Sequence, residues 1–135
     1  MSSQGSLFSF DESFIADAAV AKYRVVIAGE VSDTKGKHCK NPVQDSATIL
    51  GVAQHATTAS GDTVLVRRAG LTKLEVATAN VTYGVPLRIH DAQGRADRQT
   101  AAWVSGDGVI GYAEEASAAS GDVIECWLAI RTLLA

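Results

Sequence analysis

The sequence has few of the features that define secreted, membrane-spanning or disulfide-rich proteins. Its 135 residues include two cysteines, Cys39 and Cys126, too few for the disulfide framework of a small secreted domain. No uncharged apolar run approaches the roughly 20 residues that a membrane-spanning helix needs. The first residues lack the basic and apolar regions of a signal peptide. We therefore expect one globular domain with free thiols, folded in a reducing cytosol and without membrane contact.

Neither sign of charge dominates the chain. All 12 lysines and arginines lie at or after Lys22, whereas three of the 15 acidic residues precede it. Residues 1–21 therefore carry −3, and residues 22–135 carry 12 − 12 = 0. A neutral body has no electrostatic footprint for nucleic acid, and the acidic start does not suit an arm that binds phosphate. Nucleic acid is not an expected partner.

Residues suited to catalysis or metal binding are few and scattered. His38, His55 and His90 have no companions at metal-binding spacing, and we expect all three in solvent-exposed loops. Neither common type of glycine-rich phosphate loop is present. Cys39 lies among lysines, which indicates an exposed basic loop, whereas Cys126 is expected to be a small core residue. The sequence predicts no catalytic residue, no metal and no cofactor.

One segment matches an enzyme pattern in part. GDTVLVRR resembles the Gly-Asp-x-Val-x-Val strand of Ser–Lys peptidases of the signal-peptidase and repressor-cleaving type. Those enzymes need a nucleophilic serine followed by a Met-like residue, and a desolvated lysine base. The only methionine is Met1, and Lys73 alternates with Thr72 and Leu74 on the predicted outer face. An enzyme of this type is therefore the remote alternative.

The phenylalanines are concentrated at the N-terminus. All three lie in the first 14 residues, and two aliphatic residues accompany them: Leu7, Phe8, Phe10, Phe14 and Ile15. A domain core would normally bury such large side chains, yet the rest of the chain relies on smaller aliphatic residues. Two interpretations are open. Residues 1–21 either pack on their own domain as a strand or short helix, or form an extended arm that docks on another chain.

An internal repeat runs through the rest of the chain. Residues 49–68, ILGVAQHATTASGDTVLVRR, match residues 109–128, VIGYAEEASAASGDVIECWL, without gaps at an offset of 60. The same offset extends upstream to the Tyr-x-Val-x-Ile segment that begins at Tyr23. We interpret residues 22–75 and 82–131 as two copies of one unit, related by a pseudo-twofold axis.

Each copy has the pattern of β structure. The segments after the two Ser-Gly-Asp turns alternate with a period of two. This alternation places Val64 and Val66 of the first copy, and Ile124 and Cys126 of the second, on an inner face. A further hairpin is expected at Ala69-Gly70, where it would join TVLVRR to LTKLEV.

These patterns together predict an all-β fold. The strands ATILGVA and GVIGYA each carry a glycine, which indicates a bulge or a close backbone contact. Helical periodicity is not sustained, although single helical turns are expected near residues 14–21 or 78–83. We predict a small barrel or sandwich built from two repeats of about 50 residues, with an extended N-terminal arm.

The motifs, taken in order, resemble a known family. A Gly-Val-Ala strand, an Ala-rich connection, Gly-Asp-x-Val-x-Val, an Ala-Gly pair, Tyr-Gly-x-x-Leu and a second Gly-Tyr-Ala strand follow one another over residues 16–130. This order is similar to that of the small head decoration, or capsid cement, proteins of tailed bacteriophages.

The resemblance implies a structural virion protein rather than an enzyme. It implies β-rich subunits, often homotrimers, bound outside the major capsid protein shell near local threefold axes, with no catalytic residues. Such a protein would be made in the host cytoplasm and lie on the outer surface of the capsid. Residues 22–135 would then be the decoration domain and residues 1–21 its arm.

Two tryptophans complete the candidate contact residues. Trp127 falls on the outward face of its strand, opposite Cys126 and Leu128, where it either contacts a partner or covers a barrel end. The candidate interface with capsid or subunit is therefore Leu7, Phe8, Phe10, Phe14, Ile15, Trp103 and Trp127. A carbohydrate- or cell-surface-binding module is the alternative. It requires a concave aromatic patch, for which two tryptophans and three tyrosines are available.

Overall fold

The described part of the chain is built from strands and turns. The computed structural model describes residues 9–29, 36–43, 48–99 and 108–132, and none of these residues is helical. The all-β prediction is therefore confirmed, whereas the single helical turns expected near residues 14–21 and 78–83 are wrong.

The first half of the chain closes into a five-stranded barrel. Its strands are β1 (Phe10–Ala16), β2 (Val25–Ala28), β3 (His38–Lys40), β4 (Ile49–Ala53) and the first half of β5 (Thr63–Glu75). They pair in the order β1-β3-β2-β4-β5, and β5 pairs back to β1, so no edge remains open. The β1–β3 pair is parallel, and the other pairs are antiparallel. We call this barrel lobe 1.

The second half of β5 starts another sheet. The further strands are β6 (Pro86–Ile89), β7 (Ala96–Arg98), β8 (Gly108–Ala113) and β9 (Val123–Thr132). They follow β5 in the order β9-β8-β6-β7, and an isolated parallel bridge from Val76 to Ala96 links the chain after β5 to β7. We call this unit, from residue 70 onward, lobe 2.

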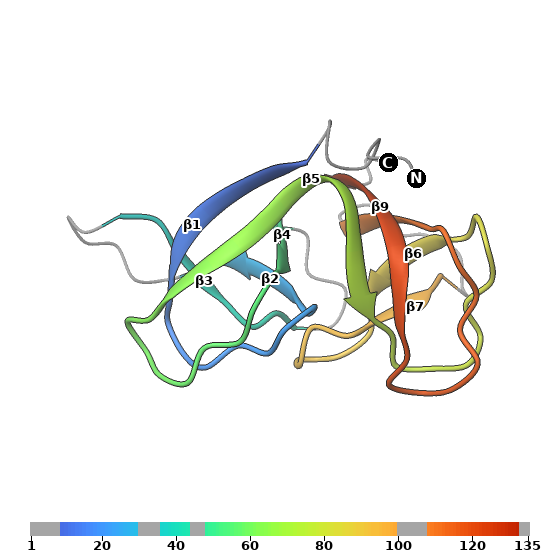
Figure 1. Cartoon of the computed structure of the whole chain (residues 1–135), viewed down its shortest axis with the longest axis horizontal. Coiled ribbons are helices and arrows are strands. Elements are labelled where there is room, and N and C mark those ends of the chain that lie inside the picture. Colours follow the sequence, from blue (N-terminus) through green and yellow to red (C-terminus); the bar gives the residue numbers. More distant parts are fainter. Residues whose placement is uncertain (1–8, 30–35, 44–47, 100–107, 133–135) are drawn as a thin grey trace, which may run out of the picture.

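Strand β5 belongs to both lobes. It arches over the molecule, with β1 beside one limb and β9 beside the other (Figure 1). The hairpin expected at Ala69-Gly70 is therefore wrong, because the chain continues as one strand through this point. Gly70 is buried and has a φ of 97°, a conformation that suits glycine, so it allows the strand to turn without ending.

The pairing of strands repeats with the offset seen in the sequence. Phe14 faces Val64 across β1 and β5, and Leu74 faces Ile124 across β5 and β9, so both partners move by 60 positions. The two Ser-Gly-Asp turns also match. The side-chain carboxylate of Asp62 accepts backbone N–H groups three and four residues earlier, and that of Asp122 does the same.

Upstream of these turns the offset changes. The N–H of Tyr23 donates to the carbonyl of Ala53, and the N–H of Gly84 donates to that of Ala113. Tyr23 therefore corresponds to Gly84, an offset of 61, rather than to Tyr83. A pseudo-twofold relation between residues 22–75 and 82–131 stays a prediction.

Two apolar clusters fill the molecule. The smaller cluster lies inside lobe 1 and contains Phe14, Val26, Val64 and Val66. The larger cluster fills lobe 2 and continues into lobe 1 through four side chains: Val25, Ile27, Ile49 and Val52. Successive residues of β2 thus point into different clusters, which joins the lobes through a continuous apolar seam. The predicted inner face is confirmed, since Val64, Val66, Ile124 and Cys126 are all buried.

Phe14 should be essential for folding, whereas Phe10 should not. Phe14 is 3% exposed and Phe10 is 55% exposed, although both lie on β1. Replacing a buried Phe with Ala costs about 3–5 kcal/mol, while an exposed substitution changes stability by about 0.5 kcal/mol or less. Chemical denaturation of F14A and F10A measures both losses. Equal losses would contradict the placement of β1 in the barrel.

Gly51 and Gly111 should not tolerate a side chain. A Cβ at Gly51 would meet the carbonyl oxygen of Arg67, and one at Gly111 would meet that of Trp127. We expect G51A and G111A each to lower the free energy of unfolding by about 1–3 kcal/mol, as for other overpacked sites. Gly61 has open space around it, so G61N is the control, because asparagine tolerates left-handed backbone. A G111A variant as stable as wild type would contradict the close approach of β8 and β9.

Candidate contact surface

Trp127 forms part of an apolar surface on lobe 2. It is 39% exposed and lies on β9 between Leu71 of β5 and Tyr112 of β8, its partners in the sheet. Arg131 donates a hydrogen bond of 3.0 Å to the hydroxyl of Tyr112 and so holds that ring in place. The outward position predicted for Trp127 is confirmed, because Cys126 and Leu128 on either side of it are buried.

The other described candidate contact residues differ in how far they are exposed to solvent. Phe14 is enclosed in the core of lobe 1, so its predicted role in an interface is wrong: the closed barrel leaves the ring no exposed surface. Ile15 is half-buried, and its backbone pairs with both β3 and β5. Phe10 remains largely exposed where β1 begins, opposite Ala69 near the bend of β5.

Three of the predicted contact residues cannot be placed. Leu7, Phe8 and Trp103 lie outside the described residues. Of the two interpretations of the N-terminal segment, packing on its own domain holds for Phe10–Ala16, which is a strand of the barrel. The described candidates that remain accessible are Phe10 and Trp127, with Ile15 partly so.

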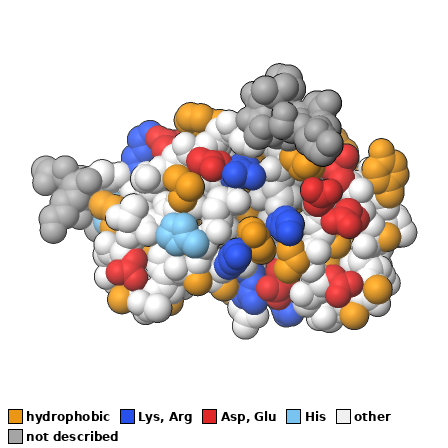
Figure 2. Space-filling view, viewed as in Figure 1, with side chains coloured by type: hydrophobic (Ala, Val, Ile, Leu, Met, Phe, Trp, Pro, Cys, Tyr) orange, Lys and Arg blue, Asp and Glu red, His pale blue; other side chains and the backbone are white. Residues whose placement is uncertain are grey.

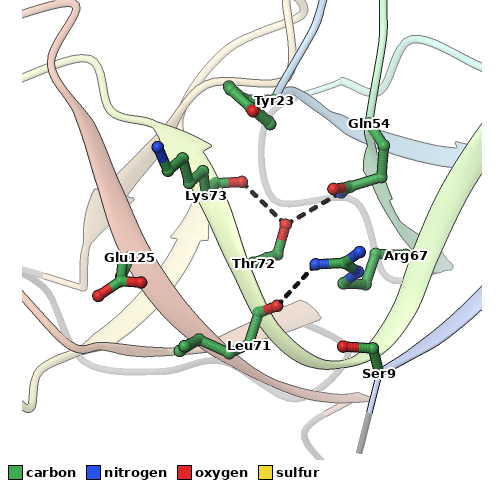
Figure 3. Close-up of a pocket in the computed structure, with 8 residues that line it drawn as sticks. All are labelled: Ser9, Tyr23, Gln54, Arg67, Leu71, Thr72, Lys73 and Glu125. Atoms are coloured by element: carbon green, nitrogen blue, oxygen red, sulfur yellow. Dashed lines mark hydrogen bonds between the residues drawn. The ribbon is translucent and has the colours of Figure 1, made fainter. Parts of the chain in front are cut away.

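A groove that the sequence did not indicate lies inside the bend of β5. It has a volume of about 320 Å³ and is lined by residues from both lobes: Ser9, Tyr23, Gln54, Arg67, Leu71, Thr72, Lys73 and Glu125. Figure 3 shows Tyr23 at one end of this interlobe groove and Ser9 at the other, with Thr72 between them. Because the lining residues come from distant segments, no local sequence motif could have predicted the groove.

Part of the groove is held rigid by internal hydrogen bonds. The amide of Gln54 donates to the hydroxyl of buried Thr72 at 3.0 Å. Arg67 donates to the carbonyl of Leu71 at 3.0 Å and forms a two-point ion pair with Asp11 of β1. The Arg67–Leu71 bond joins the two limbs of β5, and the Gln54–Thr72 bond joins the end of β4 to the second limb.

Ion pairs also fasten β1 to the rest of lobe 1. Arg68 pairs with Glu12 at 2.8 Å, and Lys37 contacts the other oxygen of the same carboxylate. Hydrogen bonds from Lys37 and then from Arg68 hold the pKa of Glu12 below its usual value. Protonating Glu12 in acid would therefore weaken the attachment of β1.

Lysine and arginine side chains gather near the middle of one face. Figure 2 shows them between the two lobes, with carboxylates interspersed. Two groove residues carry charges that form no ion pair with another described residue, namely Lys73 and Glu125, although they face each other across β5 and β9. The interlobe groove is thus polar and open, and it retains unpaired charge.

Of the three histidines expected in exposed loops, His55 matches the prediction and His38 does not. His38 lies in β3 with a side chain that is 7% exposed, and its Nδ1 lies 2.7 Å from a carboxylate oxygen of Asp17, so the exposed-loop prediction is wrong for this residue. His55 is exposed, and its Nε2 accepts the backbone N–H of Leu65. His90 is half-buried.

The cysteines are both buried and unbonded. Cys126 lies on the inner face as predicted, and burial raises the pKa of its thiol to about 12. The exposed basic loop predicted around Cys39 is wrong, because pairing of β3 with β1 and β2 turns this side chain into the core of lobe 1. Burial, and then the nearby charge of Asp17, raise its pKa to about 11.

The described residues do not assemble a recognisable reaction centre. Within these ranges, no three His, Cys, Asp or Glu side chains cluster in a way that would hold a metal ion. The same ranges contain no helix long and apolar enough to cross a membrane. The features that remain are surfaces: the apolar area around Trp127, the exposed Phe10 and the interlobe groove.

Comparisons with known proteins give one matching family and one similar fold. A family described as phage cement protein matches residues 10–128. The fold is similar to a solved structure described as the head fiber gp8.5 N base in bacteriophage phi29. That likeness has a TM-score of 0.67 and 18% identity, and it covers 90% of this chain and 94% of that chain. None of the curated proteins compared with the sequence matches it.

Both thiols should be unreactive in the folded protein. Reaction requires the thiolate, and burial disfavours it at Cys39 and at Cys126. At pH 8 we expect a thiol reagent to label neither residue in native protein and both after denaturation. Rapid labelling of native Cys39 would contradict its burial, and failure to label either cysteine in denatured, unoxidised protein would contradict free thiols.

Proposed function

The chain belongs to the phage cement protein family, and on this basis we propose that it binds the outside of the major capsid protein shell and stabilises the phage head. The family match carries this proposal, since residues 10–128 include both lobes and nearly every strand. A structural role associated with the capsid needs no reaction centre. It needs a rigid fold and accessible contact residues.

The fold supplies the rigidity that such a role requires. Lobe 1 is closed, and the apolar seam fixes it against lobe 2. Contacts made by the two lobes are therefore presented to a partner at a fixed separation, which limits the ordering cost of binding. A protein of this kind would resist expansion of the shell by holding neighbouring subunits together.

We propose Trp127 and Phe10 as contact residues toward capsid or subunit. Large exposed aromatic side chains are frequent centres of binding energy at interfaces. The family resemblance also supports a homotrimer near local threefold axes. Three copies that act together would attain high occupancy even if each contact were weak.

Two other functions have less support. A carbohydrate-binding module needs several aromatic rings in a concave site, and Tyr23 is the single aromatic residue that lines the interlobe groove in the described part of the chain. A Ser–Lys peptidase needs a desolvated lysine base, whereas Lys73 is exposed. The structural role is therefore the better proposal.

Binding to shells assembled from the major capsid protein alone tests the proposed function. We expect the purified protein to co-sediment with such shells and to raise the temperature at which they open. An immobilised panel of glycans serves as the competing substrate. Retention on glycans without binding to shells would favour the carbohydrate alternative and overturn the proposal.

Substitutions on the exposed aromatic residues test the contact surface. We expect W127A and F10A each to weaken shell binding about tenfold or more, the usual effect of removing an aromatic hot spot. Y83A is the matched control, because Tyr83 is 73% exposed and lies at neither place. Deleting residues 1–8 keeps β1 and tests Leu7 and Phe8 separately. Binding unchanged in both aromatic variants would exclude these residues as contacts.

A further inference from the structure

Tyr23 has an unfavourable backbone conformation. Its φ is 60°, and it is the one residue other than glycine with a positive φ in the described ranges. Bulky side chains rarely adopt this left-handed conformation because the Cβ crowds the following carbonyl. Such strain persists when the surrounding structure or a function maintains it.

The second lobe shows that the fold does not need a tyrosine here. Gly84 occupies the corresponding position, with a φ of 85° and the equivalent backbone hydrogen bond to β8. At Tyr23 the N–H donates to Ala53 at 2.8 Å, and the carbonyl accepts from the N–H of Glu75 at 2.9 Å. Both bonds use only the main chain, so glycine would preserve them. The main-chain hydrogen bonds therefore do not require a tyrosine at this position.

The Tyr23 ring lies where a partner can reach it. The side chain is half-buried and lines the interlobe groove. In Figure 3, Lys73 lies on the neighbouring limb of β5 in the same half of the groove as Tyr23, and its side chain runs outward. The ammonium group of Lys22 lies 4.7 Å from the ring centroid, a cation–π distance. One lysine thus contacts the ring, and a second lines the same groove.

The charges near the ring favour an anionic partner. Lys22 and Lys73 form no ion pair with another described residue. Arg67 is already neutralised by Asp11, which leaves the two lysines and the single carboxylate of Glu125. The charges of Lys73 and Glu125, which line the groove, cancel, and Lys22 beside the Tyr23 ring leaves one net positive charge at this end.

The shape of the groove favours a chain segment over a small molecule. Its volume, about 320 Å³, is at the lower limit for small-molecule pockets, which are usually enclosed and lined mainly by apolar groups. This groove is open, and its lining is mostly polar. An extended segment could cross it and exchange hydrogen bonds with side chains from both lobes.

We infer that the interlobe groove binds an extended acidic segment of the capsid protein, with Tyr23 as the central contact residue. This inference rests on the proposed function, and it adds a second contact surface besides Phe10 and Trp127. The strain at Tyr23 is retained because its ring packs against the bound segment, while Lys22 and Lys73 pair with carboxylates of that segment.

Substitution of Tyr23 provides the main test. Y23G copies the residue found at the equivalent position of lobe 2, and Y23N keeps a side chain that tolerates left-handed backbone. We expect both variants to fold, with midpoints of thermal unfolding close to that of wild type, and to bind shells of capsid protein about tenfold more weakly. Y83A again serves as the aromatic control.

Two charge variants test the chemistry of the partner. We expect K73Q to weaken binding about threefold, as loss of one exposed charge pair would, and E125Q to bind as well as wild type or better. Added decaglutamate should compete with shells for wild type and less effectively for K73Q. Competition by maltoheptaose in place of decaglutamate, or weaker binding of E125Q than of K73Q, would overturn an acidic partner.

The outcomes separate this inference from the proposed function. If wild-type protein does not bind shells, the proposed function fails. If wild type binds and folded Y23G and Y23N bind equally well, the groove is not a contact surface while the proposed function stands. Loss of binding in these two variants with retained stability, together with competition by decaglutamate, would support the inference.

Discussion

The architecture depends on one strand that serves two sheets. The first limb of β5 completes the barrel of lobe 1, and the second limb begins the sheet of lobe 2. The strand can turn between them because Gly70 accepts a positive φ in a buried position. Without this turn, the two limbs could not belong to different lobes, and the groove inside the bend would not exist.

The second constraint is the apolar seam, which fixes the lobes against each other. Val25 and Ile27 point into the larger cluster, whereas Val26 between them points into the core of lobe 1. Strand β2 is therefore covered on both faces, by lobe 2 on one side and by the core of lobe 1 on the other. An ion pair between Arg24 and Glu75 crosses the same junction beside the seam. The lobes are consequently held in a fixed arrangement by contacts between their cores.

Because of these constraints, the unpaired charges and accessible aromatic rings of the described residues lie on the surface. The interior is almost entirely aliphatic, and its two thiols are protonated by burial. Unpaired charge and exposed aromatic rings are found instead around the bend of β5 and along β9. Tyr23, which has a positive φ, also lies on this surface.

The sequence alone determined the features that depend on neighbours along the chain. Alternation with a period of two identified the all-β class and the inner faces, including Cys126 and the outward Trp127. The glycines in two strands correctly indicated close backbone approach at Gly51 and Gly111. Each of these properties depends on local backbone geometry, and neighbouring residues in the sequence determine that geometry.

Only the tertiary structure decided the features that depend on distant partners. Ala69-Gly70 suits a hairpin or a bend equally well, and pairing of the two limbs with different strands selected the bend. Cys39 lies in a polar, basic segment, yet its pairing with β1 places it in the core. The same closure of the barrel buried Phe14, and folding of distant segments brought Tyr23 beside Lys73. A sequence pattern cannot specify these placements, because the contacts that fix them are made between residues far apart in the chain.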